Sequence, residues 1–415
     1  GVSVAVIQDG VPLLVRGYGM ADLEGHRPAA ADTIYRIGSI TKSFTAAAIM
    51  KLVADGKVAL DEPITTYLSD YDTHGATITV RNLLNHTSGI KGYTEIDAFW
   101  PRSATDFPRA ELVEMFSEPP LEFPPGSRWQ YSNSGYYLLG MIIEKVTGKR
   151  YADVVRERLT APAGLADTSY CPDRMTTPRQ ARPYEVDGGK VKPADAIAMS
   201  HPFAAGALCS TVLDLAHWID GLNAGRIVTP AQWADMTRPV KLADGRLFPY
   251  GFGIMAGELG GHRKLGHNGG INGFHSKVEI YPDDHLVIAV LANTGEGVVE
   301  PLADALARTA LGVPEAKVLD VPLGSDEAAL YVGRFHFEDV PVRLAFRYQD
   351  GALQAANLDE SGNPGNWLPL HHQGNHVFVA TEVKARITFV VEGGKVTGIQ
   401  VEQGGLHLHG TPMPE

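Results

Sequence analysis

The chain has 415 residues, of which 44 % are hydrophobic and 20 % are charged, and its formal net charge is -12. This composition is that of a globular protein long enough for two domains. The acidic balance argues against nucleic acid or an anionic membrane surface as a partner, and no apolar run reaches the roughly 18 residues that a membrane span needs.

The first fifty residues predict a hairpin followed by a buried helix. Asp9-Gly10 is a typical two-residue hairpin turn between apolar runs at 2–8 and 11–19. After a β-like run at 33–37, small and apolar residues continue from Ser39 to Gly56, and glycine is a common helix stop. Because the sequence opens inside a strand, without Met or a signal peptide, we expect an N-terminal segment to be missing from it.

The predicted helix begins with a serine and a lysine three residues apart, Ser39 and Lys42. Residues at this spacing lie on one face of a helix, so the hydroxyl and the amine are expected to meet at the helix N-terminus. Apolar surroundings disfavour a charged ammonium, and a neutral lysine can accept the serine proton. This pair is the minimum equipment of a serine acyl-transfer enzyme.

A second Ser-x-x-Lys sequence, Ser88-Gly89-Ile90-Lys91, competes with the first. Gly89 directly after the serine and Gly92 after the lysine indicate a loop, in which pairing between residues three apart is not enforced. We therefore expect Ser39 to be the nucleophile and Ser88 to be a loop residue.

Helical segments dominate the middle of the chain, and strands return after it. Helices are predicted at 79–85, 109–117, 134–147, 211–225 and 298–311, and strands at 250–257, 263–267, 275–281 and 286–292. Strands at both ends, with helices between them, predict one sheet assembled from the two ends of residues 1–312 and carrying a helical insertion. Catalytic groups are expected at that junction.

The sequence changes character after Gly312. Residues 313–325 contain proline and glycine and predict a linker, which separates a domain at 1–312 from a domain at 326–415. The second domain shows short strands with turns at Asp350-Gly351, Gly374-Asn375, Gly393-Gly394 and Gly404-Gly405. That spacing predicts a small antiparallel β-barrel of about 85 residues.

Two further polar motifs follow the Ser-x-x-Lys pair. In Tyr131-Ser132-Asn133 a phenol and a carboxamide two residues apart can both face a cleft, and the alternative is a helix N-cap beside a core tyrosine. His267-Asn268-Gly269-Gly270 follows a predicted strand. Its glycines allow a ligand to approach the N–H groups of an edge strand, and the alternative is a glycine turn with an incidental histidine.

In this order the three motifs resemble those of the serine β-lactamase-like family, which includes class C β-lactamases, D-alanyl-D-alanine carboxypeptidases, D-aminopeptidases and related esterases. Segments 83–89, 205–211 and 281–283 also look like the family. The resemblance covers residues 1–312 and implies an α/β (α+β) β-lactamase/transpeptidase-like fold, an antiparallel sheet flanked by helices with a helical subdomain. The C-terminal part looks like the lipocalin-like barrel appended to some members.

The resemblance implies a serine hydrolase that works through an acyl-enzyme on Ser39. Lys42 and Tyr131 would share the proton shuttle, and which of the two is the base stays open. The backbone N–H groups of Ser39 and Gly270 would form the oxyanion hole. The residues that would bind and orient the substrate are Asn133, His267 and Gly269.

His267 stands where many members have a lysine. Histidine has an unperturbed pKa of about 6.5 and is mostly neutral at pH 7, so it suits a carboxylate-bearing β-lactam less well than a permanent cation does. The resemblance therefore favours a peptidase or amidase acting on small or D-amino-acid-containing peptides. A carboxylesterase with weak β-lactamase activity, and a penicillin-binding sensor module that acylates without turnover, are the alternatives.

No cofactor or metal is expected, because the sequence contains no His-Glu-x-x-His motif and no nucleotide-binding glycine pattern. His371, His372 and His376 are expected to decorate a turn.

Cys171 and Cys209 form no Cys-x-x-Cys motif and are expected to be free buried thiols. A single disulfide between them is the alternative and would suit an oxidising compartment. The resemblance favours a periplasmic or secreted protein, and the oligomeric state stays open.

Overall fold

The computed structural model describes residues 1–174, 176–295, 297–315, 318–337, 340, 342–359, 361–403 and 406–413. The chain divides into two compact units, Gly1–Val313 and Pro314–Glu415, and each unit has a core of its own.

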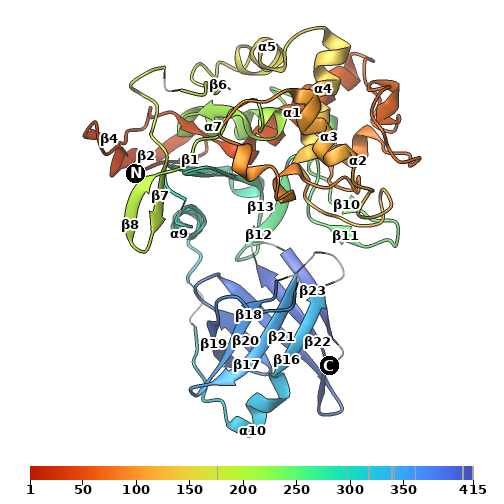
Figure 1. The fold of residues 1–415 in the computed structure, drawn as a ribbon. Helices are drawn as coiled ribbons and strands as arrows, with labels where there is room; N and C mark the ends of the chain where they lie inside the picture. The colour runs from red at the N-terminus through yellow and green to blue at the C-terminus, as the bar shows by residue number, and fades with distance from the viewer. Residues whose placement is uncertain are drawn as a thin grey trace. The chain divides into compact units, whose positions relative to one another are not determined.

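A six-stranded antiparallel sheet forms the centre of the first unit (Figure 1). Its strands, in spatial order, are β12 (Met255–Leu259), β13 (His262–Ile271), β14 (Phe274–Tyr281), β15 (Leu286–Ala292), β1 (Val2–Gln8) and β2 (Val11–Tyr18). The strand β1 pairs with its hairpin partner β2 and also with β15, where Val4 lies opposite Val290. The two ends of this unit therefore meet in one sheet, as the placement of the predicted strands indicates.

Helices cover both faces of the sheet, because its central strands are apolar on both sides. Ala5 and Ile7 of β1 share a core with α1 (Thr41–Ala54) and α7 (Val212–Asn223). Val4 and Val6, which point to the other face, share a smaller core with α9 (Val299–Leu311). The helix α1 is buried along most of its length, as expected from the small and apolar residues that make up most of it.

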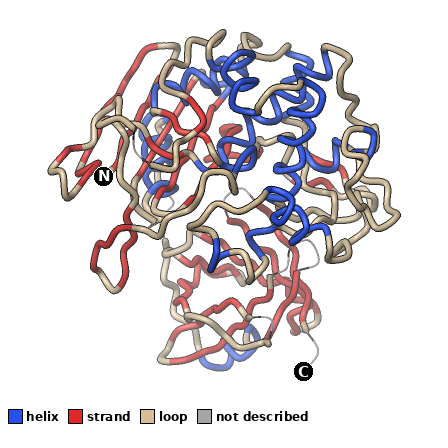
Figure 2. The backbone as a smooth tube through the Cα atoms, turned by 45° about the horizontal axis from the view of Figure 1, so that its top comes forward, coloured by secondary structure: helices blue, strands red, loops and turns tan. Residues whose placement is uncertain are grey.

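In the insertion between the two ends of the sheet, most of the regular secondary structure is helical, and loops join the helices (Figure 2). Its helices are α2 (Val80–Leu84), α3 (Arg109–Ser117), α4 (Asn133–Thr147), α5 (Tyr151–Val155), α6 (Phe203–Gly206) and α8 (Pro230–Met236). The single turns of helix in this unit are η1 (Gly38–Ile40), η2 (Ile64–Thr66), η3 (Tyr93–Glu95), η4 (Trp100–Arg102), η5 (Arg156–Thr160) and η6 (Pro282–Asp284). Its short strands are β3 (Met20–Asp22), β4 (Arg27–Pro28), β5 (Tyr35–Arg36), β6 (Ser169–Tyr170), β7 (Tyr184–Asp187), β8 (Lys190–Pro193), β9 (Leu208–Ser210), β10 (Val240–Lys241) and β11 (Leu247–Phe248).

One predicted strand is partly wrong. The strand expected at 250–257 begins only at Met255, because the preceding residues turn back beneath α1. Gly253 has φ +66°, and a Cβ at this position would lie 2.7 Å from the carbonyl of Lys42. Only glycine permits this approach, which brings residues 250–254 against the start of the nucleophile helix.

The expectation of two free thiols is also wrong, since Cys171 and Cys209 form a disulfide with their Cα atoms 5.1 Å apart. β6 and β9 are antiparallel neighbours, and the N–H of Cys171 donates to the carbonyl of Ala207 at 2.8 Å. This pairing brings the two cysteines within the range of Cα separations that a disulfide spans. The two strands are too short to be recognised from their sequence, so the sequence did not favour this disulfide, which it offers as the alternative, over free thiols.

The second unit is a closed antiparallel barrel (Figure 1). Its strands are β16 (Gly333–Phe337), β17 (Arg343–Gln349), β18 (Ala352–Asn357), β19 (Leu368–Gly374), β20 (Val377–Ala380), β21 (Ala385–Glu392), β22 (Lys395–Gln403) and β23 (Leu406–Pro412), preceded by α10 (Ser325–Ala328) and η7 (Ala329–Tyr331). Side chains fill its interior, among them Phe335, Phe346, Phe378 and Phe389. The predicted small barrel is confirmed.

Three of the four predicted barrel turns join neighbouring strands: Asp350-Gly351, Gly374-Asn375 and Gly393-Gly394. The fourth, Gly404-Gly405, lies outside the described residues. His371 and His372 belong to the strand β19 and not to a turn, whereas His376 does lie in the turn that follows.

In the part of the chain that the structure describes, no helix is long and apolar enough to cross a membrane.

Candidate active site

The turn that carries Ser39 lies against β13. η1 leads directly into α1 and leaves Ser39 half-buried. Gly38 has φ +48°, and a Cβ there would lie 2.8 Å from the carbonyl oxygen of Gly270. On the neighbouring strand, Ser276 Oγ donates to the carbonyl of Ile37 at 2.8 Å. Glycine is therefore required before the serine, and the turn is fixed beside Gly270.

Lys42 is fully buried one helical turn beyond Ser39, and its amine lies within hydrogen-bond distance of three oxygen atoms. Nζ lies 3.0 Å from Ser39 Oγ, 2.7 Å from Asn133 Oδ1 and 2.9 Å from the carbonyl of Ala205. Desolvation lowers the pKa of Lys42 well below its ordinary value. The structure thus brings together the hydroxyl and the amine that the sequence pairs, in surroundings that favour the neutral amine.

Tyr131 lies beside both the lysine and the serine. The Lys42 amine is 4.6 Å from the centre of the Tyr131 ring. Desolvation raises the pKa of Tyr131, although a hydrogen bond with the Ser39 side chain acts in the opposite direction. Desolvation therefore favours the uncharged form of both candidate proton carriers, the free amine of Lys42 and the protonated phenol of Tyr131.

Both interpretations of the Tyr131-Ser132-Asn133 motif hold in the structure. Ser132 caps α4, because its side chain accepts a hydrogen bond from the N–H of Gly135 at 3.2 Å. Asn133 turns its carboxamide toward Lys42 and donates from Nδ2 to Thr94 Oγ1 at 3.0 Å. The Ser132 cap fixes the backbone where α4 begins, and this backbone carries the phenol of Tyr131 just before the cap and the amide of Asn133 just after it.

The third motif lies within β13 and does not follow it, which corrects the predicted strand end at 267. β12 pairs with β13 only as far as Gly266, so the strand has an open edge beyond that residue. A Cβ at Gly269 would lie 2.1 Å from the carbonyl oxygen of Ile37. The glycine therefore lets the strand contact the nucleophile turn, and the site receives backbone from both segments.

His267 is buried at 4 % exposure, with its ring centre 6.3 Å from that of Tyr131. Its Nε2 lies 2.9 Å from Tyr250 Oη, and its Nδ1 contacts the carbonyl of Asn268. Desolvation, together with the charge of Lys42, lowers the pKa of His267 to about 3. The ring is therefore neutral at physiological pH.

Three groups at the site were not predicted from the sequence. The carbonyl of Ala205 accepts from Lys42. The side chain of His86 contacts the Tyr131 turn, and the side chain of Tyr250 contacts both His86 and His267. His86 and Ala205 lie in segments that resemble the family, which is a signal that could have found them. Nothing in the local sequence marks Tyr250.

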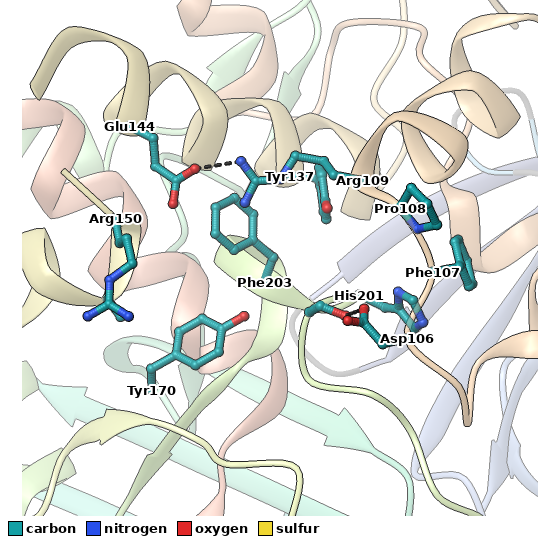
Figure 3. Close-up of a pocket in the computed structure, with 12 residues that line it drawn as sticks. Asp106, Phe107, Pro108, Arg109, Tyr137, Glu144, Arg150, Tyr170, His201 and Phe203 are labelled. Carbon is teal, nitrogen blue, oxygen red and sulfur yellow. Dashed lines mark hydrogen bonds and ion pairs between the residues drawn. The ribbon is translucent and has the colours of Figure 1, made fainter. Parts of the chain in front are cut away.

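A cavity away from these residues lies beside α3, α4 and α6 (Figure 3). It has a volume of about 760 Å³, and none of its lining residues is a predicted site residue. Figure 3 shows Arg109 and Glu144 paired across one wall, with Arg109 Nη1 and Glu144 Oε2 2.5 Å apart.

In the described residues, no group of three His, Cys, Asp or Glu side chains is placed to hold a metal.

The chain is similar in sequence to known hydrolases. Residues 1–312 match the family model described as beta-lactamase. A D-aminopeptidase from Brucella canis is 28 % identical over 326 residues, which cover 76 % of this chain and 60 % of that protein. A D-aminopeptidase from Brucella anthropi is 28 % identical over 336 residues, which cover 78 % of this chain and 62 % of that protein. The chain thus spans about three fifths of the length of these relatives.

Solved structures extend this likeness to the fold. The D-amino acid amidase from Ochrobactrum anthropi SV3, complexed with L-phenylalanine amide, is 29 % identical with a TM-score of 0.64, and the match covers 75 % of this chain and 92 % of that chain. An octameric penicillin-binding protein homologue from Pyrococcus abyssi is 25 % identical with a TM-score of 0.69, and the match covers 98 % of this chain and 95 % of that chain. The fold expected from the sequence is confirmed.

Proposed function

The chain belongs to the beta-lactamase family, and on that premise we propose that it is a serine peptidase or amidase that forms an acyl-enzyme on Ser39. The observation that carries the proposal is the fully buried Lys42 amine, 3.0 Å from Ser39 Oγ. A half-buried hydroxyl next to a neutral amine is an activated nucleophile.

The proposed reaction uses Lys42 as the base and Tyr131 as the proton carrier. Ser39 Oγ attacks the substrate carbonyl, its proton passes to the neutral Lys42 amine, and the backbone N–H groups of Ser39 and Gly270 stabilise the oxyanion. When the amide C–N bond breaks, the leaving amine takes a proton through the Tyr131 phenol, which is reprotonated from Lys42. Water then cleaves the Ser39 ester, which releases the acid and restores the serine.

The charges around this site favour substrates without a carboxylate at the third motif. His267 is neutral, since desolvation is the largest of the effects that lower its pKa to about 3. A penicillin carboxylate would find no cation at this position, whereas a neutral amide would lose nothing. This supports a peptidase or amidase over an efficient β-lactamase.

Acidic groups near the Tyr131 turn point in the same direction. Gln130 Nε2 donates to Glu122 at 2.6 Å, and Glu95 follows Thr94, the partner of Asn133. Partial desolvation raises the pKa of both glutamates, although the charge of Lys91 acts on each in the opposite direction. With one lysine and two carboxylates, this side of the turn keeps an acidic balance that suits a cationic substrate group. We therefore propose substrates with a free amino group. D-aminoacyl amides are examples, since the similar proteins include a D-aminopeptidase and a D-amino acid amidase.

The test is a substrate panel with the wild type and Ser39→Ala. The panel contains D- and L-alanine amide, N-acetyl-D-alanine amide, p-nitrophenyl acetate and nitrocefin. The proposal predicts steady turnover of the free-amine amides, less of the acetylated amide, and no turnover of any of them by Ser39→Ala. Turnover of the ester alone would favour the carboxylesterase, a stable adduct without turnover would favour the sensor module, and equal activity of the two proteins would refute the nucleophile.

A further inference from the structure

A buried chain of side chains joins the Tyr131 turn to the third motif. The N–H of Ser132 lies 3.1 Å from His86 Nδ1, and His86 Nε2 lies 3.1 Å from Tyr250 Oη. Tyr250 Oη lies in turn 2.9 Å from His267 Nε2, and His267 Nδ1 contacts the carbonyl of Asn268. The side chains of His86, Tyr250 and His267 are almost fully buried.

The two ends of this chain fix the direction of every hydrogen bond in it. A backbone N–H can only donate, so Nδ1 of His86 accepts from Ser132 and the proton of His86 is on Nε2. A backbone carbonyl can only accept, so the proton of His267 is on Nδ1 and its Nε2 accepts from Tyr250. Tyr250 then accepts from one imidazole and donates to the other. The third aromatic neighbour, Tyr136, donates its own proton to the carbonyl of Leu84 at 2.7 Å.

His86 also holds the backbone on both sides of Tyr131. Its carbonyl accepts from the N–H of Gln130 at 3.0 Å, and its ring accepts from the N–H of Ser132. The ring itself packs on that of Tyr131, with the centres 4.4 Å apart. His86 adopts φ +61°, a left-handed conformation that is costly for a histidine and is kept only where the surroundings impose it.

From these contacts we propose that His86 and Tyr250 are positioning residues, which hold Tyr131 beside Ser39 and lock His267 into the neutral form that carries its proton on Nδ1. A ring with protons on both nitrogens cannot accept from Tyr250 or from Ser132, so protonation of either histidine breaks the chain. It would also bury an unpaired positive charge among side chains that exclude water. The groups that face the two rings are Lys42, Tyr131, Tyr136 and Tyr250.

The first test needs no variant and no substrate. Long-range ¹H–¹⁵N spectra of the ¹⁵N-histidine-labelled wild-type chain distinguish a protonated from an unprotonated ring nitrogen. We expect His86 with its proton on Nε2 and His267 with its proton on Nδ1, both unchanged from pH 6 to pH 9. The opposite tautomer in either ring, or a doubly protonated ring at pH 6, would overturn the proposal.

The second test is kinetic and rests on the proposed function. Tyr250→Phe removes the central oxygen, and misplacement of reacting groups should lower kcat by roughly 10- to 100-fold while KM changes little. His86→Asn keeps an acceptor near the Nδ1 position and His86→Gln keeps a donor near the Nε2 position. We expect each to retain more kcat than His86→Ala, because each preserves one half of the chain.

Tyr151→Phe is the matched control. The Tyr151 phenol is also fully buried and makes a 2.7 Å hydrogen bond with Thr45 Oγ1. Neither residue belongs to the row of hydrogen bonds from Ser132 to Asn268. It should leave kcat within about twofold of wild type, since it alters no group near the reacting atoms. If Tyr250→Phe and His86→Ala fold with the wild-type Tm and keep wild-type kcat, the positioning role is refuted. Activity that survives Ser39→Ala would instead refute the proposed function and leave the tautomers to be judged by the spectra alone.

Discussion

The chain contains two Ser-x-x-Lys segments that are alike in sequence and differ in every physical respect that matters for catalysis. In the first, Ser39 and Lys42 lie on successive turns of a helix, and the buried amine contacts the hydroxyl at 3.0 Å. In the second, Ser88 Oγ accepts instead from the N–H of Ile90 at 3.2 Å, and the described residues show no hydrogen bond between Ser88 and the Lys91 amine. A motif of two residues acquires its chemistry from the helix that spaces them and the core that desolvates the lysine.

Gly89 shows why the second segment cannot imitate the first. It has φ +77°, and a Cβ there would lie 2.1 Å from the carbonyl oxygen of Phe123. The left-handed backbone at this residue interrupts any helix that begins at Ser88. The loop is built to contact Phe123, whereas the turn before Ser39 is built to contact Gly270.

The largest expected effect is the loss of activity in Ser39→Ala with retention in Ser88→Ala. Removal of a catalytic nucleophile commonly costs roughly 10⁴-fold or more in kcat. The rate of D-alanine amide hydrolysis measures both variants under one set of conditions. A comparable loss in Ser88→Ala, with an unchanged Tm, would erase the distinction between the two segments.

The kcat values of Lys42→Met and Lys91→Met should differ by less than those of Ser39→Ala and Ser88→Ala, although still by a wide margin. Loss of a general base costs roughly 10²- to 10⁴-fold, whereas Lys91 has no proposed catalytic role. Because desolvation lowers the pKa of Lys42, the active neutral amine persists well below pH 10.5, and activity should fall as the pH falls through that lowered pKa. The pH dependence of Ser39 labelling by a fluorophosphonate measures this, and a pH profile unchanged by Lys42→Met would exclude Lys42 as the base.

The disulfide distinguishes the surroundings of the first segment from those of the second. It joins β9, which pairs with β5 just before Ser39, to the residue after β6. For a sequence separation of 38 residues, loop entropy predicts a loss of about 4 kcal/mol in the free energy of unfolding when both cysteines are replaced by alanine. Guanidinium denaturation of the Cys171→Ala/Cys209→Ala protein measures the loss, and a change below about 1 kcal/mol would show that the pairing contributes little.

The smallest predicted effect concerns His267, which lies beside the first segment only. Its pKa is lowered to about 3, so between that value and 6.5 the unfolded chain binds a proton that the folded chain does not. Its contribution to the stability is therefore complete above pH 6.5 and should fall by about 2 kcal/mol on going to pH 5. His267→Gln should lose this pH dependence in urea denaturation, whereas His217→Gln, at an exposed position, should keep it. Equal slopes for wild type and His267→Gln would contradict the buried neutral ring.

The prediction from sequence succeeded where local patterns determine the structure. Apolar runs beside Asp9-Gly10 predict the hairpin, and the small and apolar residues that make up most of α1 predict its burial. The spacing of Ser39 and Lys42 predicts their contact, because helix geometry alone enforces it.

The prediction failed where distant segments decide the outcome. Tyr250 reaches the site only because Gly253 lets residues 250–254 pass under Lys42. Cys171 and Cys209 pair because strands of two and three residues meet. β13 continues past His267 because β14 pairs with it as far as Ile271. None of these contacts leaves a periodic signal in the sequence.

The acyl-enzyme itself is the most direct test of the central claim. The protein is mixed with p-nitrophenyl acetate, quenched in acid during turnover, digested and analysed by mass spectrometry. The account predicts one acetyl group on the peptide that contains Ser39, its disappearance in Ser39→Ala, and its persistence in Ser88→Ala. An acetyl group on Ser88, or turnover with no modified peptide in the wild type, would contradict it.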